Sequence, residues 1–392
     1  MSNLQKSIMK SRLPPIPSAS KISKLDGSSR RGFQKDYSPK QWNEYFKERQ
    51  IVPVEDNKFC VYKSAEPQEK GPLIILLHGG GFSALTWALF SQEITSMIFC
   101  QCLAVDLRGH GDTETTDDWD LSATTLATDV AKVISALYPE GNPQIILVGH
   151  SMGGAIATHL VHLNLVSNLI GLTVIDVVEG TAMDALASMQ SFLRSRPSHF
   201  KSIPQAIEWS VRSGQIRNLE SAKVSMPGQI IDTETKKLST NELPLPETSE
   251  PAPAVSTFAN PLSIPEDAEA DTPESSASVF KAPEVANAKK YTWRIDLSKS
   301  EKFWAGWFEG LSQKFLDLPV AKLLLLASID GLDRTLTVGQ MQGKFQMQVL
   351  ARCGHAVHED RPCEVAEVIA SYMIRNEFAT ACGEFVRHMP AC

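Results

Sequence analysis

The sequence predicts an α/β fold, with a mostly parallel central sheet, helices on both faces and a helical cap. Three observations support this prediction. Short apolar runs alternate with segments of helical periodicity, a glycine-flanked serine follows one of the runs, and an aromatic-rich region separates two others. Strands covered by helices on both faces have near-continuous apolar sequences. The chain of 392 residues is 43% hydrophobic, which is enough for one sizeable core.

The predicted strands are apolar runs of four to six residues. They cover residues 73–77, 102–105, 144–148, 172–175, 323–326 and 345–350. Residues 124–137 and 365–374 have apolar side chains at helical spacing, and they precede the third run and follow the last one. We therefore expect alternating strands and helices in one domain.

Two aromatic-rich segments, residues 183–217 and 291–308, predict the cap. Between them, residues 228–289 have eight prolines from Pro244 to Pro283 and many Ser, Thr, Glu and Asp residues. Such a composition does not bury enough apolar surface to fold, so we predict a disordered acidic insertion at 228–289. Residues 1–36 are rich in Lys, Arg, Ser and Pro and are predicted to form a disordered basic tail. The folded domain is then expected at 37–227 and 290–392.

Composition also narrows the class of protein. The net charge of −7 provides no general attraction for nucleic acid or an anionic membrane. The N-terminus has no apolar signal-like run, and no stretch reaches the length of a membrane helix. The seven scattered cysteines lack paired spacing, which predicts reduced thiols and no metal site. We expect a protein of the cytoplasm, the nucleus or both that is not secreted.

Ser151 is the predicted nucleophile. The run Gly149-His150-Ser151-Met152-Gly153 matches G-x-S-x-G, the sharp strand-to-helix turn that exposes a serine hydroxyl in α/β hydrolases. The expected context is present, because an apolar strand precedes the motif and an alanine-rich helix follows it. Serine in this setting is typical of acyl-transfer enzymes.

Backbone amides are predicted to stabilise the oxyanion of the tetrahedral intermediate. One donor usually follows the nucleophile, which points to Met152. A second donor usually lies in the loop after an early strand, and the glycine-rich run of residues 78–81 occupies that place. Gly80 or Gly81 is therefore the expected second donor.

His355 is the predicted general base. It follows the last predicted strand and precedes the terminal helix, which is where this fold places its histidine. His358 is the second candidate, three residues later. His110 and His150 adjoin motif glycines, and we expect them to pack and form hydrogen bonds.

The acid that orients the base has two possible locations. Asp330 or Asp333 would follow the penultimate strand, which is the usual position in this fold. Asp176 directly follows the strand at 172–175 and would emerge at the same edge of the sheet. The residues alone do not separate these locations.

Five longer runs allow a comparison with a known family. Residues 78–87, 149–154, 174–182, 339–346 and 353–360 resemble the protein phosphatase methylesterase family, and the likeness extends over about 36–225 and 290–378. The resemblance implies an α/β-hydrolase fold with Ser151, Asp176 and His355 as triad. It implies no metal or organic cofactor, and a triad that aligns only when the phosphatase docks. The family's insertion has more continuous acidic runs than residues 228–289.

The resemblance also implies a substrate. Members remove the methyl ester from the C-terminal leucine of the protein phosphatase 2A catalytic subunit, which is met as part of its core enzyme. Two other functions stay open at this point. The chain could be a general carboxylesterase or lipase for small esters, or a phosphatase-binding scaffold with little catalysis.

Overall fold

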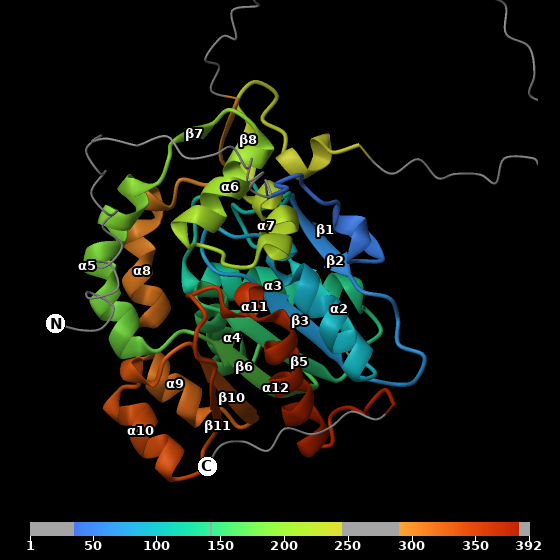
Figure 1. The fold of residues 1–392 in the computed structure, drawn as a ribbon. Helices are drawn as coiled ribbons and strands as arrows, with labels where there is room; N and C mark the ends of the chain where they lie inside the picture. The colour runs from blue at the N-terminus through green and yellow to red at the C-terminus, as the bar shows by residue number, and fades with distance from the viewer. Residues whose placement is uncertain (1–34, 142, 245–289, 384–392) are drawn as a thin grey trace, which may run out of the picture.

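A mostly parallel sheet of eight strands forms the middle of the molecule (Figure 1). The computed structural model describes residues 35–141, 143–244 and 290–383. The strand order is β1-β2-β4-β3-β5-β6-β10-β11. Strand β2 pairs antiparallel with both β1 and β4, and all other neighbouring strands are parallel. Their bounds are Glu48–Val54, Asn57–Lys63, Gln101–Val105, Leu73–Leu77, Ile145–His150, Leu169–Ile175, Ala321–Leu326 and Gln346–Val349 in that order.

The sheet confirms the predicted fold class. All six apolar runs became strands β3, β4, β5, β6, β10 and β11. The hairpin of β1 and β2 was not predicted, because its charged and polar residues interrupt the apolar pattern that marks the inner strands. It lies at the sheet edge, where one side of a strand faces solvent.

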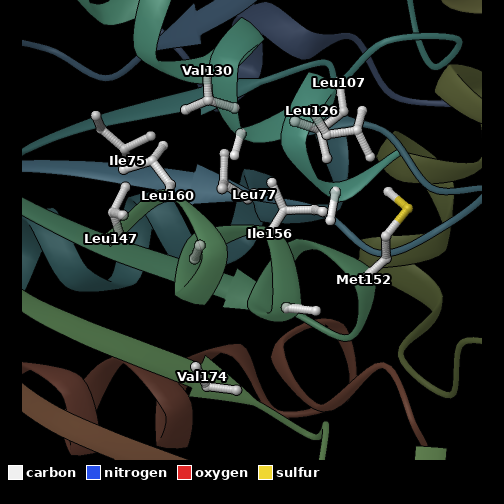
Figure 2. Packing of buried hydrophobic residues seen from close by; sticks show 14 of the residues in the cluster. Ile75, Leu77, Leu107, Leu126, Val130, Leu147, Met152, Ile156, Leu160 and Val174 are labelled. Atoms are coloured by element: carbon white, nitrogen blue, oxygen red, sulfur yellow. The ribbon is translucent and has the colours of Figure 1, made fainter. Parts of the chain in front are cut away.

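Successive side chains of the inner strands point to opposite faces of the sheet and pack into two separate hydrophobic cores. Ile75 and Leu77 pack with helices α3 (Ala123–Leu137), α4 (Met152–His162) and α9 (Leu311–Asp317) on one face. Ile74 and Leu76 pack with α2 (Ala88–Met97) and α12 (Pro362–Arg375) on the other. Figure 2 shows the first core, where Ile156 of α4 meets Leu77. Burial on both faces explains why β3 is apolar at every position.

The cap lies between β6 and β10 in the chain. Its helices are α5 (Glu179–Ser195), α6 (Ile203–Ser213), α7 (Leu219–Ser225) and α8 (Glu301–Phe308), and its small sheet is β7-β9-β8 with bounds His199–Phe200, Tyr291–Trp293 and Ile230–Asp232. The short 3-10 helices are η1 (Trp42–Glu44), η2 (Ala84–Trp87), η3 (Met226–Gln229), η4 (Ser239–Glu242), η5 (Leu297–Ser300) and η6 (Ile329–Gly331). Helices α10 (Arg334–Met341) and α11 (Val357–Asp360) complete the fold.

The predicted insertion begins too early in the chain, because its first residues belong to the cap. Residues 228–244 are folded, since Ile230 pairs with Trp293 across the small sheet and Leu238 is buried. The pairing joins segments on opposite sides of the insertion, which local composition cannot reveal. Residues 245–289 of the insertion and 1–34 of the predicted tail lie outside the described residues. Among the residues described, no helix has the length and apolar character needed to cross a bilayer.

Candidate active site

Ser151 stands at the junction of β5 and α4, on a strained turn. Its backbone has φ 52° and ψ −119°, a region that non-glycine residues rarely adopt. The Ser151 N–H donates to the carbonyl oxygen of Ile175 at 2.9 Å, which ties the turn to the end of β6. A serine held this way projects its hydroxyl above the carboxyl edge of the sheet.

The motif glycines are required by the closeness of the backbone. A β-carbon on Gly149 would lie 2.3 Å from the carbonyl oxygen of Gly153, and one on Gly153 would lie 2.3 Å from that of Leu77. Neither contact is possible for a real side chain. Glycine at both positions therefore lets α4 begin directly against β3.

Asp176 and His355 are brought together at this edge. Nδ1 of His355 lies 2.7 Å from Oδ2 of Asp176. The other carboxylate oxygen accepts from the Ala327 N–H at 2.9 Å, so both oxygens of Asp176 are engaged and its side chain is held in place.

The alternative acids lie elsewhere in the same region. The Asp333 carboxylate accepts the Leu336 N–H at 2.8 Å as the N-cap of α10, and it also accepts from the Ser312 hydroxyl. Asp330 is in the turn η6. Of the carboxylates left open by the sequence, the geometry pairs Asp176 with the predicted base.

Electrostatics in the pair favour a proton on His355. Partial desolvation opposes protonation, but the hydrogen bond and negative charge of Asp176 outweigh it and raise the pKa of His355. Burial likewise opposes ionisation of Asp176, and the hydrogen bond from His355 overcomes it and lowers the pKa of that carboxyl. Since Nδ1–H faces Asp176, Nε2 is the nitrogen free to accept a proton.

In the described part of the chain, no hydrogen bond joins the Ser151 hydroxyl to the His355 imidazole. Among the described residues, no hydrogen bond reaches Oγ of Ser151, and the His355 side chain is 57% exposed. The acid–base pair is therefore formed, while its link to the nucleophile is open.

His358 has a structural environment. It is fully buried, its ring centroid lies 4.1 Å from that of Trp87, and its Nε2 shares a hydrogen bond with the Thr86 hydroxyl at 3.0 Å. Burial lowers its pKa to about 3. A ring so weakly basic and so enclosed is a poor general base, which leaves His355 as the candidate.

One of the predicted oxyanion donors is already committed. The Gly81 N–H donates to Nε2 of His110 at 2.9 Å, while Nδ1 of His110 donates to the Arg108 carbonyl oxygen. Gly81 is therefore corrected as a donor, because its proton points at the imidazole. Gly80 stays the predicted donor of this loop, and a β-carbon on it would lie 3.6 Å from Sδ of Met152.

Sequence reasoning missed Arg196. Its guanidinium lies over the Trp293 ring, with Cζ 3.6 Å from the ring centroid, beside the loop that carries Gly80. The only signal was the presence of Arg and Trp residues in the predicted cap. Among the described residues, no group of three or more His, Cys, Asp or Glu side chains could hold a metal ion.

The assembled groups suit acyl transfer. A strained serine at the same sheet edge as an imidazole oriented by a carboxylate is typical of enzymes that attack a carbonyl carbon. In such enzymes, backbone N–H groups next to the serine stabilise the oxyanion. The site does not by itself specify the acyl group.

Comparison with known proteins shows which family this chain resembles. A family model described as "Alpha/beta hydrolase family" matches residues 74–368. Protein phosphatase methylesterase 1 of Mus musculus is 49% identical over 405 residues, covering 100% of both chains. The Bos taurus protein of that name is 50% identical over 398 residues, covering 98% of this chain and 100% of its own. A probable protein phosphatase methylesterase 1 of Caenorhabditis elegans is 38% identical, covering 96% and 86%.

Solved structures of low identity share the fold. E-2-(acetamidomethylene)succinate hydrolase has a TM-score of 0.58 at 15% identity, covering 83% of this chain and 99% of its own. An esterase of Mycobacterium tuberculosis has a TM-score of 0.53 at 18% identity, covering 83% and 92%.

Proposed function

Because the chain belongs to the protein phosphatase methylesterase 1 family of α/β hydrolases, we propose that it demethylates the C-terminal leucine methyl ester of the protein phosphatase 2A catalytic subunit. It acts as a serine carboxylesterase on the phosphatase core enzyme, in the cytoplasm, the nucleus or both. The observation that supports the chemistry is the Asp176–His355 pair, 2.7 Å apart, at the sheet edge that carries Ser151.

The first half-reaction forms an acyl-enzyme. Oγ of Ser151 attacks the ester carbonyl carbon while Nε2 of His355 takes the hydroxyl proton, and the N–H groups of Met152 and Gly80 stabilise the oxyanion. Collapse of the tetrahedral intermediate breaks the bond to methoxide, which leaves as methanol with the proton from His355. The leucine carbonyl is then bound to Ser151 as an ester.

The second half-reaction releases the product. Water attacks the acyl-enzyme as His355 takes its proton, and a second tetrahedral intermediate forms at the same amides. Its collapse returns the proton from His355 to Oγ of Ser151 and frees the leucine carboxylic acid, which loses its remaining proton to solvent and becomes the carboxylate. Throughout, Asp176 keeps the imidazole in the tautomer whose Nε2 is free.

Contact between Ser151 and His355 must form during this cycle. Both are present in the required order, yet no hydrogen bond joins them among the described residues. We attribute closure of this gap to docking of the phosphatase, whose tail would displace solvent from the exposed ring of His355.

The test uses the carboxymethylated protein phosphatase 2A core enzyme. It is incubated with the wild-type chain, with Ser151→Ala and with Ser188→Ala, an exposed serine of α5. Mass spectrometry of the C-terminal peptide measures the methyl group. We expect the wild type and Ser188→Ala to remove it and Ser151→Ala to leave it in place. An ester left intact by the wild-type chain contradicts the proposal.

A further inference from the structure

Arg196 differs from the other shielded arginines of the structure. In the described part of the chain, the arginines at least partly shielded from solvent are Arg49, Arg108, Arg196, Arg294 and Arg361. All except Arg196 pair with a carboxylate, namely Asp112, Asp129, Asp118 and Glu364. The described residues offer the Arg196 side chain no hydrogen-bond acceptor and no ion pair. A charged group that loses water without gaining a partner is unfavourable, so an external acceptor is the natural complement.

Trp293 holds the guanidinium in one place. Cζ of Arg196 lies 3.6 Å from the centroid of the indole ring, and the indole is fixed by a hydrogen bond from its Nε1 to the Pro197 carbonyl oxygen at 2.7 Å. Phe200 and Trp209 each pack edgewise near the same ring at 5.4 Å. Stacking satisfies the face of a guanidinium but leaves its in-plane N–H groups free.

The position of Arg196 adjoins the proposed reaction centre. A β-carbon on Gly81 would lie 3.7 Å from Nη1 of Arg196, and one on Gly80 would lie 3.6 Å from Sδ of Met152. The guanidinium therefore flanks the loop that carries the proposed oxyanion donor. A ligand that extends from Ser151 along this loop would reach the guanidinium.

Within the described ranges, no neighbouring carboxylate neutralises this charge. Asp296 attracts Arg196 at a distance, but its Oδ1 accepts from the N–H and hydroxyl of Ser298, at 3.1 and 2.6 Å. Its Oδ2 lies 3.9 Å from Nζ of Lys299. Desolvation lowers the pKa of Arg196 to about 10, with Asp296 opposing the shift, so the side chain is a cation at neutral pH.

We infer that Arg196 binds a carboxylate of the protein tail that occupies the Ser151 site. This deepens the proposed function and rests on it for the identity of the tail. The planar fork of N–H groups matches the two oxygens of a carboxylate. The ester itself is neutral, so the carboxylate is either an acidic side chain upstream of the ester or the C-terminal group that its cleavage creates.

Direct binding of short peptides separates these two sources. Fluorescein-labelled hexapeptides ending in leucine are titrated with the full chain and their anisotropy measured. The reference peptide has no acidic residue and a C-terminal amide. A second set has one Asp at each of the other positions in turn, with the amide retained, and a third peptide is the reference with a free C-terminal carboxylate. No turnover is needed for this measurement.

Variants assign the effect to Arg196. We compare the wild type with Arg196→Gln, with Arg196→Lys and with Arg194→Gln, an exposed arginine in the last turn of α5, the helix whose C-cap is Arg196. Each variant is scored by the ratio of its Kd for the reference peptide to its Kd for a charged peptide. The fraction of correctly folded protein cancels in this ratio.

We expect a Kd about tenfold lower for one charged peptide than for the reference, as one charge-assisted contact provides. The ratio should fall to about one in Arg196→Gln, stay intermediate in Arg196→Lys and be retained in Arg194→Gln. An effect of Asp identifies the side-chain source, and an effect of the free C-terminus identifies the product. Equal Kd values for all peptides, absence of binding, or a ratio retained in Arg196→Gln overturns the inference. Failure of the esterase function would instead appear as an intact methyl ester in the demethylation assay.

Discussion

The ring of His150 is hydrogen-bonded to the backbone of His355. Its Nε2 lies 2.8 Å from the His355 carbonyl oxygen, and since a carbonyl only accepts, Nε2 carries the proton. Burial lowers the pKa of His150 well below its usual range, so the ring is neutral. His150 immediately precedes Ser151, and this contact therefore links the turn that holds the proposed nucleophile to the loop that holds the proposed base.

Removing this donor should weaken catalysis. In His150→Phe the ring volume stays while the hydrogen bond is lost, and we expect kcat to fall about tenfold, the value of one hydrogen bond. His150→Gln keeps an N–H donor and should recover part of the rate. Because the ring acts through His355, the pH at half-maximal kcat should also move in His150→Phe. Wild-type kcat and an unchanged pH profile in a folded His150→Phe variant would show that the contact has no catalytic role.

The rate should fall on the acidic side at a higher pH than an ordinary histidine would give. His355 must be neutral to accept the Ser151 proton, and Asp176 raises its pKa. As pH falls through that raised value, the base becomes protonated and kcat/KM declines. The measurement is a pH–rate profile with a small ester substrate.

Asp176→Asn is expected to lower kcat by a factor on the order of 10³ to 10⁴ through loss of the tautomer and of imidazolium stabilisation. It should also move the acidic limb to lower pH, since the charge that raises the pKa of His355 is gone. Asp333→Asn is the matched control and should keep near-wild-type kcat, because Asp333 caps α10. Loss of rate in the control with retention in Asp176→Asn would reverse the assignment of the acid.

A methyl group on Gly153 should destabilise the fold. Its β-carbon would lie 2.3 Å from the Leu77 carbonyl oxygen, a backbone atom that cannot rotate away. We expect Gly153→Ala to cost at least about 2 kcal/mol, seen as a Tm lower by roughly 5 °C. Gly306 lies inside α8 with nothing near its β-carbon position, so Gly306→Ala should leave Tm unchanged or slightly raised.

Glu359 should make stability depend on pH. It is fully buried, accepts a hydrogen bond from the Ser221 hydroxyl at 2.8 Å, and burial raises its pKa to about 7. An acid whose pKa is higher in the folded state binds more protons there, so its contribution is lost as pH rises from its ordinary value of 4.5 to about 7.

Replacing this carboxyl with a neutral amide should remove that dependence. Relative to wild type, Glu359→Gln should gain stability between pH 5 and pH 8, by at most about 3 kcal/mol. Tm measured at both pH values in wild type and variant gives the comparison. A difference in Tm between the two proteins that is the same at both pH values would count against ionisation of Glu359 as the cause.

Local patterns in the chain were sufficient to predict the framework of the fold and the strained turn at Ser151, which the structure contains. Leu73–Leu77 is apolar at every position because both of its faces are buried. Such a run can be recognised as an inner strand without knowing which strands pair with it. The glycines at 149 and 153 can be recognised as part of a sharp turn for a similar reason, because the turn itself leaves no room for a β-carbon at either position. These constraints act over a few residues, and so they appear directly in the sequence.

The pairings of the site depend on contacts between distant segments, and folding alone selects among them. Strands β6 and β10 are neighbours, with Ile175 opposite Leu325, so the candidate acids after both strands emerge at one edge and look equivalent in the sequence. The Ala327 N–H and the N-cap of α10 then assign Asp176 and Asp333 to different partners. The commitment of Gly81 to His110 and the open guanidinium of Arg196 arise in the same way, because hydrogen-bond partners are set by three-dimensional proximity.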